Sequence, residues 1–134
     1  MFGVRTDERG AAAVEFAIVL PILVVILFGV IEFGIVMTKL VTYVSAAREG
    51  ARYAAVHCEP EHSQCQTQYV RDRVINAANG YPVDTTAFSV STDCTLPPPG
   101  QLVRVSWTQP ISLEIPMLPD MSFTKTIEGS FRCE

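Results

Sequence analysis

The hydrophobic pattern near the N-terminus is that of a membrane-spanning helix. Phe16–Ile31 reads FAIVLPILVVILFGVI and contains no charged or strongly polar side chain. With the residues that flank Glu15 and Glu32, the apolar segment covers residues 11–37, which at about 1.5 Å per residue is long enough to cross a bilayer with some tilt. The small residues Ala11–Ala13 precede this segment, whereas a signal-peptidase site would follow it. We therefore expect a transmembrane helix over about residues 11–37.

The helical pattern continues beyond the apolar segment and becomes amphipathic. Apolar residues recur there at spacings of three and four, as one face of a helix requires. Many of them are small, so another element can approach closely; we expect the chain's own sheet to pack there, with a groove for another subunit as the alternative. One helix is predicted over residues 11–57. The small residues are Ala46, Ala47, Gly50, Ala51, Ala54 and Ala55.

A second, shorter helix is predicted over residues 66–78. Pro60 and its polar neighbours break the first helix, and Gly80 suits the position just past the end of the second. The buried face of this helix is predicted to hold Tyr69, Val70, Val74 and Ala77.

From Thr85 onward the hydrophobic period changes to two, which indicates β-strands with one buried face. Proline-rich turns at residues 96–100 and 116–120 separate the alternating stretches, and Lys125 is the exception to the inward pattern. We predict three or four antiparallel strands, and hence an α+β fold: a long N-terminal helix packed on a small antiparallel sheet, with one short extra helix. The inward positions are Phe88, Val90, Val103, Val105, Trp107, Ile111, Leu113, Ile115, Phe123, Ile127, Phe131 and Cys133.

The four cysteines allow three disulfide pairings. Cys58 and Cys65 flank a short polar loop, while Cys94 and Cys133 share the parity of inward strand positions. We therefore predict the pairs Cys58–Cys65 and Cys94–Cys133. Disulfides persist only in an oxidising compartment, which places residues 58–134 outside the cytoplasm as a disulfide-linked domain.

Zinc binding is the alternative use of this region, because His57, Cys58, His62 and Cys65 bring nitrogen and sulfur ligands together. The spacing of the two cysteines lacks the C-x₂₋₄-C pattern of common structural zinc sites. The prediction is therefore no metal.

Composition narrows the possible functions. Apolar residues make up 49% of the 134 residues and charged residues 18%, with a net charge of −4 and no cluster of Lys or Arg. A nucleic-acid-binding protein needs a basic surface, so this class is disfavoured. Because the sequence also has no phosphate-binding glycine loop, nucleophile elbow or H-E-x-x-H motif, we expect neither an enzyme nor a cofactor.

The Glu15 carboxylate lies near the N-terminal end of the apolar helix, in the segment Arg9–Phe16, which reads RGAAAVEF. One interpretation is a Glu in the first helical turn, where the helix dipole favours negative charge. The other is a cut after Gly10, which would create an α-amino group at Ala11, four residues before Glu15. In helices packed side by side, the amine of one could then neutralise the carboxylate of another and fix their axial stagger.

The N-terminal sequence RGAAAVEFAIVLPILVVILFGVIEFG resembles the start of TadE-like minor pilins (pseudopilins) of the Tad/Flp type IV pilus system. The matching residues are Gly10, Glu15-Phe16, Pro21 and Ile31–Gly34, followed by the small-residue stretch 46–52. The resemblance implies a leader at residues 1–10 that a prepilin peptidase removes. It also implies a single-pass protein of the bacterial cytoplasmic membrane, in contact with lipid, with other pilins and with an assembly platform and its ATPase. The major Flp pilins are much shorter, so a minor subunit is implied.

Two points stay open at this stage. Pro21 removes one backbone hydrogen-bond donor and should kink or loosen the helix. Such a proline is either tolerated in a transmembrane helix with no functional role, or it is a weak point of the helix in a filament. The alternative to a pilin is a bitopic membrane-anchored envelope protein whose outer domain binds a partner without entering a pilus.

Overall fold

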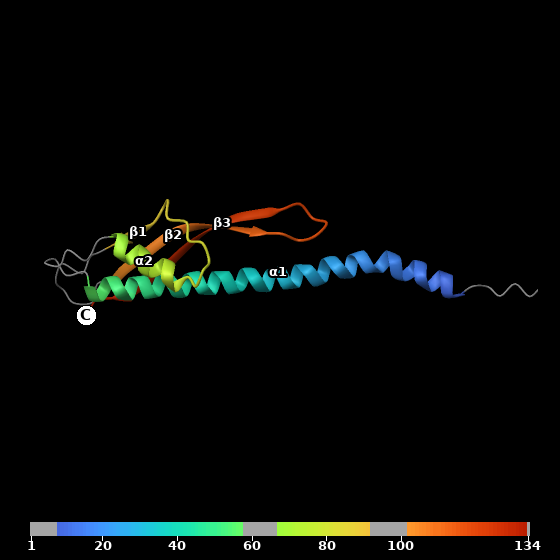
Figure 1. The fold of residues 1–134 in the computed structure, drawn as a ribbon, viewed down its shortest axis with the longest axis horizontal. Helices are drawn as coiled ribbons and strands as arrows, with labels where there is room; N and C mark the ends of the chain where they lie inside the picture. The colour runs from blue at the N-terminus through green and yellow to red at the C-terminus, as the bar shows by residue number, and fades with distance from the viewer. Residues whose placement is uncertain (1–7, 58–66, 92–101, 134) are drawn as a thin grey trace, which may run out of the picture.

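The computed structural model describes residues 8–57, 67–91 and 102–133. One long helix runs the length of the molecule, and the other elements gather along its C-terminal half (Figure 1). The predicted α+β fold is therefore confirmed. The elements in chain order are α1 (Glu8–His57), α2 (Thr67–Ala77), β1 (Ser89–Ser91), β2 (Leu102–Leu113) and β3 (Met121–Arg132).

The sheet is antiparallel, with strand order β1-β2-β3. Its register places Trp107 opposite Ile127 and Val105 opposite Gly129, so inward positions of β2 and β3 face the same side. β2 is one continuous strand through Pro110. β1 pairs with residues 104–106 of β2, so at Pro110 the strand β2 is paired with β3 alone among the described strands. A residue without an N–H is tolerated at such an edge position.

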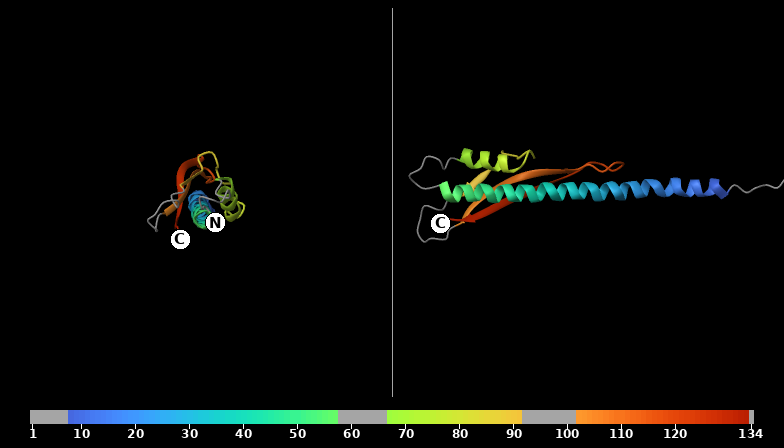
Figure 2. Two further views of the ribbon diagram at one scale, coloured as in Figure 1. Left: turned by 90° about the vertical axis from the view of Figure 1, so that its left-hand side faces the viewer. Right: turned by 60° about the horizontal axis from the view of Figure 1, so that its bottom comes forward.

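The core lies where α1 meets the sheet and α2, which lie on different sides of it (Figure 2). The small face of α1 is covered by the chain's own elements, as predicted, and α2 contributes as well as the sheet. The wholly buried residues include Ala46, Ala47, Ala51 and Ala54 of α1, Val70 and Val74 of α2, and Val103, Val105, Trp107 and Ile127 of the sheet.

Helix α2 lies within one residue of its predicted bounds, but its buried face is narrower than predicted. Val70 and Val74 are buried and Ala78 continues their spacing, whereas Tyr69 is 50% exposed. A helix that packs on one neighbour buries a single row of residues at spacing four, and Tyr69 lies beside that row. After Ala78, Asn79 and Gly80 take left-handed backbone angles (φ 52° and 88°), which ends the helix as the glycine predicted.

The inward pattern of β3 holds only for its second half. Ile127 is buried and Phe131 is half-buried, but Phe123 is 44% exposed, contrary to prediction. The β2–β3 hairpin continues toward the N-terminal half of α1 (Figure 1). Ile111, opposite Phe123 in the register, is still buried, so the cover at this level reaches β2 but not the edge strand β3. Lys125 breaks the pattern for the same reason, since it is exposed at the point where the core ends.

We predict that Gly129→Ala strongly destabilises the protein. A Cβ at Gly129 would fall on main-chain atoms of Ala47 and Arg48 of α1, which cannot rotate away as a side chain could. The expected loss is about 3 kcal/mol in free energy of unfolding, measured by urea unfolding of the detergent-solubilised chain.

Two glycines of α1 serve as graded controls for this prediction. Gly50→Ala should cost less, because the added Cβ would meet the side chains of Val74 and Val70. Gly34→Ala should cost nothing, since no atom lies within 4 Å of the added Cβ. Equal stability of the Gly129 and Gly34 variants would show that the helix–strand contact is looser than described.

Candidate functional site

The N-terminal half of α1 is an exposed apolar surface. Every residue from 10 to 23 is exposed, including Val14 at 61% and Phe16 at 62%. The helix from Gly10 is long and apolar enough to cross a membrane, judged by length and composition, and its most apolar stretch is not buried within the protein. Exposed apolar surface of this extent needs a cover that the described helices and strands do not supply.

Glu15 is the acidic group of this surface that the sequence singled out. It lies on an exposed turn of α1 between Val14 and Phe16. In the part of the chain that the structure describes, no hydrogen bond or ion pair involves its carboxylate. A carboxylate in an apolar setting needs a cation or several donors to be stable, so a partner has to come from outside these residues.

Gly10 and Ala11 lie in the first turns of α1, ahead of Glu15. No atom lies within 4 Å of a Cβ built on Gly10, so packing within the chain does not explain a glycine there. Glycine is also a poor helix former, at a cost of about 1 kcal/mol relative to Ala. Because the first N–H groups of a helix lack partners within it, this turn can unwind at little cost.

Pro21 lies inside α1, and the helix continues through it without a break. Figure 1 shows α1 curving in its N-terminal part. A proline removes one hydrogen bond of the helix, which favours bending at that point. A role for Pro21 as a weak point in a filament stays a prediction.

A charged pair on the surface joins the second helix to the first. Glu49 of α1 accepts two hydrogen bonds from the Arg73 guanidinium of α2, at 2.7 and 3.2 Å. Glu49 also pairs with Arg52 of the same helix, three residues on, at 4.0 Å. Both arginines are more than half exposed, so these pairs add little stability.

A buried polar link between the sheet and the linker that precedes β1 was missed by the sequence analysis. Gln109 is 5% exposed, and its Oε1 accepts hydrogen bonds from the Trp107 indole (3.2 Å) and from the Asp84 backbone N–H (2.9 Å). Its place in the alternation of β2 marked it as inward, but alternation alone does not name the donors that it meets.

Tyr43 makes a second link between α1 and the same linker. Its hydroxyl donates to the Pro82 carbonyl at 2.9 Å, and its ring meets Trp107 edge-on. Burial raises the pKa of this phenol, with Tyr81 adding to the shift. Since the neutral form is favoured in the folded state, this contribution to stability is present at neutral pH and is lost only in strongly alkaline solution.

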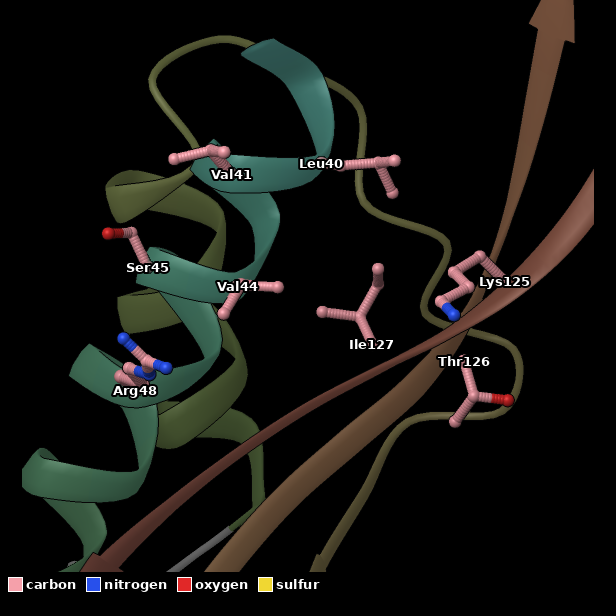
Figure 3. Close-up of a pocket in the computed structure, with 8 residues that line it drawn as sticks. All are labelled: Leu40, Val41, Val44, Ser45, Arg48, Lys125, Thr126 and Ile127. Carbon is pink, nitrogen blue, oxygen red and sulfur yellow. The ribbon is translucent and has the colours of Figure 1, made fainter. Parts of the chain in front are cut away.

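A groove of about 380 Å³ opens between α1 and β3. Figure 3 shows Ile127 of β3 pointing toward Leu40 and Val44 of α1, with Arg48 and Lys125 on opposite sides. The groove lies where the hairpin parts from the helix, and its walls are mainly apolar. It is an apolar hollow at the end of the core that is nearer to the N-terminal half of α1, with no cluster of reactive groups among its lining residues.

The predicted cysteine chemistry falls mostly outside the described residues. Cys58, Cys65 and Cys94 lie there, so the predicted pairs stay predictions; Cys133, half-buried after β3, is disulfide-bonded. Within residues 8–57, 67–91 and 102–133, no three His, Cys, Asp or Glu side chains gather as a metal site would require. His57, the one described member of the zinc alternative, stacks on Tyr53 with ring centroids 4.2 Å apart.

Comparison with known proteins gives one match. Residues 10–52 match the family model described as TadE-like protein. No curated protein and no solved structure matches the chain. The matched segment begins at Gly10, includes Glu15 and Pro21, and ends within the small-residue face, so it covers both the exposed half of α1 and its packed half.

Replacement of Gln109 by Leu should destabilise the protein by about 1–3 kcal/mol, because the buried Trp107 indole N–H and the part-buried Asp84 N–H lose their acceptor. Chemical unfolding followed by Trp107 fluorescence measures the change. The control is Gln68→Leu, at an exposed position of α2, which should leave stability unchanged. If the two variants were equally stable, water would have to reach the Trp107 indole and the Asp84 N–H.

Proposed function

We propose that this protein, whose residues 10–52 match the TadE-like family model, is a minor pilin (pseudopilin) that supports assembly of a Tad (Flp) pilus. In this proposal a prepilin peptidase cuts after Gly10, and the mature chain begins at Ala11. Residues 11–37 anchor the protein in the cytoplasmic membrane, and the disulfide-linked α+β domain lies outside the cytoplasm.

The observation that carries this proposal is the environment of the Glu15 carboxylate. Its carboxylate stands on an exposed apolar helix surface with no partner among the described residues. Cleavage after Gly10 would place a positive charge one helical turn away, at Ala11. When such helices pack side by side, the amine of one subunit can neutralise the Glu15 carboxylate of a neighbour. This ion pair then holds the helices in one axial stagger.

The exposed half of α1 supplies the surface for that packing. Apart from Glu15, it is apolar on all sides between Gly10 and Leu23, so it can be covered by lipid before assembly and by neighbouring helices afterwards. The proposal therefore has four kinds of partner: the prepilin peptidase, other pilins of the same system, the membrane platform with its ATPase, and membrane lipid.

Cleavage is tested by intact-mass measurement of the membrane-extracted protein, which should begin at Ala11. Gly10→Ala or a bulkier residue should block processing and leave residues 1–10 attached. Gly29→Ala is the matched control, since this glycine also lies in α1 with no atom within 4 Å of an added Cβ. A chain that keeps residues 1–10 in cells with working pili would refute the proposal.

The role of Glu15 is tested by Glu15→Gln. The variant should be cleaved normally but reduce piliation about tenfold or more, because an amide cannot neutralise the amine of a packed neighbour. Glu32→Gln, the other carboxylate of the apolar segment, is the control and should assemble normally. Normal pili with Glu15→Gln would remove this carboxylate from the mechanism.

Sheared filaments distinguish a pilus subunit from a membrane-anchored protein of other function. We expect the chain to be recovered with the filaments. Its complete retention in the membrane fraction of piliated cells would favour a bitopic envelope protein that binds its partner without entering a pilus.

A further inference from the structure

The turn between β2 and β3 exposes apolar side chains at the far end of the hairpin. A tight turn at Ile115–Leu118 is closed by the Leu118 N–H, which donates to the Ile115 carbonyl at 3.1 Å. Met117 is 78% exposed and Leu118 45%, and the strand residues behind them, Met121 and Phe123, are 59% and 44% exposed. We call residues 115–118 the hairpin tip.

Met117 is not explained by the chemistry of the turn. Its φ of 70° is left-handed, and it follows Pro116 at the position where this kind of turn strongly favours Gly or Asn. Packing does not explain it either, since most of its surface is exposed. A flexible apolar side chain is thus held in the turn of the hairpin in a backbone conformation that a glycine would adopt without strain.

The position of the hairpin tip along α1 indicates what covers it. Val36, inside the apolar segment 11–37, is only 3% exposed, so the folded part of the protein already overlaps the end of that segment. The hairpin extends farther toward the N-terminus of α1, and its tip lies beside the apolar part of the helix (Figures 1 and 2).

We propose that the hairpin tip docks into the interfacial region of the same bilayer that α1 spans. The inference rests on the membrane anchoring stated under the proposed function. It gives the outer domain a second point of attachment to lipid, and it fixes how the domain is oriented over the membrane surface.

The backbone chemistry of the tip suits the headgroup–acyl boundary. Pro116 and the following Pro119 have no N–H to desolvate, and the Leu118 N–H is already bonded within the turn. Glu114 and Asp120 flank the tip and stay at the level of the headgroups. Because residues 113–121 contain no Lys or Arg, docking depends on apolar contact and does not need anionic lipid.

The test places a tryptophan at the tip of the full-length chain, reconstituted in phosphatidylcholine vesicles with brominated acyl chains. Fluorescence of Met117→Trp should fall by roughly twofold relative to unbrominated vesicles, after subtraction of the signal of buried Trp107 in the parent protein. Leu118→Trp should behave alike. Asn76→Trp, on the exposed face of α2, is the control and should not be quenched.

Phe28→Trp, within the apolar segment of α1, separates the two possible failures. If it is quenched while both tip variants are not, the docking of the tip is overturned and membrane anchoring stands. If it is not quenched either, the membrane-spanning assignment of α1 fails as well. A tip tryptophan that is shielded from aqueous iodide but insensitive to brominated lipid would show that another protein subunit covers the tip, which also overturns the inference.

Discussion

The close approach of α1 to the sheet and to α2 is the constraint on which the rest of the structure depends. At Gly129 the backbone of β3 lies against the backbone of α1 at Ala47, and at Gly50 the side chain of Val74 takes the place of a missing Cβ. Larger residues at these points would lift the sheet and α2 away from the helix. The small residues therefore set the position of the whole domain, and Trp107 fills the space that remains between the layers.

One helix thus serves two environments. Its C-terminal half presents small residues and is buried by the chain's own elements, whereas its N-terminal half presents large apolar residues that no described element covers. The helix has no break between the two halves. The position of Glu15 relative to the domain is consequently fixed by the length of α1, so an axial stagger set at the N-terminus also sets the position of the outer domain.

The sequence was sufficient for features that depend on periodicity and small residues. The long helix, the second helix and the inward parity of β2 follow from spacings of four and two, and residues 46–54 indicated a close packing face. Tyr69 and Phe123 were wrongly placed in the core, because periodicity shows which residues share a face but not where the covering layer ends. The acceptor role of Gln109 and the pairing of Glu49 with Arg73 depend on contacts distant in sequence, which no local pattern contains.

The elongated arrangement has a mechanical consequence. The β2–β3 hairpin lies along α1 in a long contact (Figure 1), and the buried residues of α1 extend from Val36 to Ala54. A pull on the N-terminus of α1 along its axis would load this contact in shear, so that many packed side chains resist at once instead of separating one after another. A protein built in this way can be drawn out of a membrane by its helix while the folded domain travels with it intact.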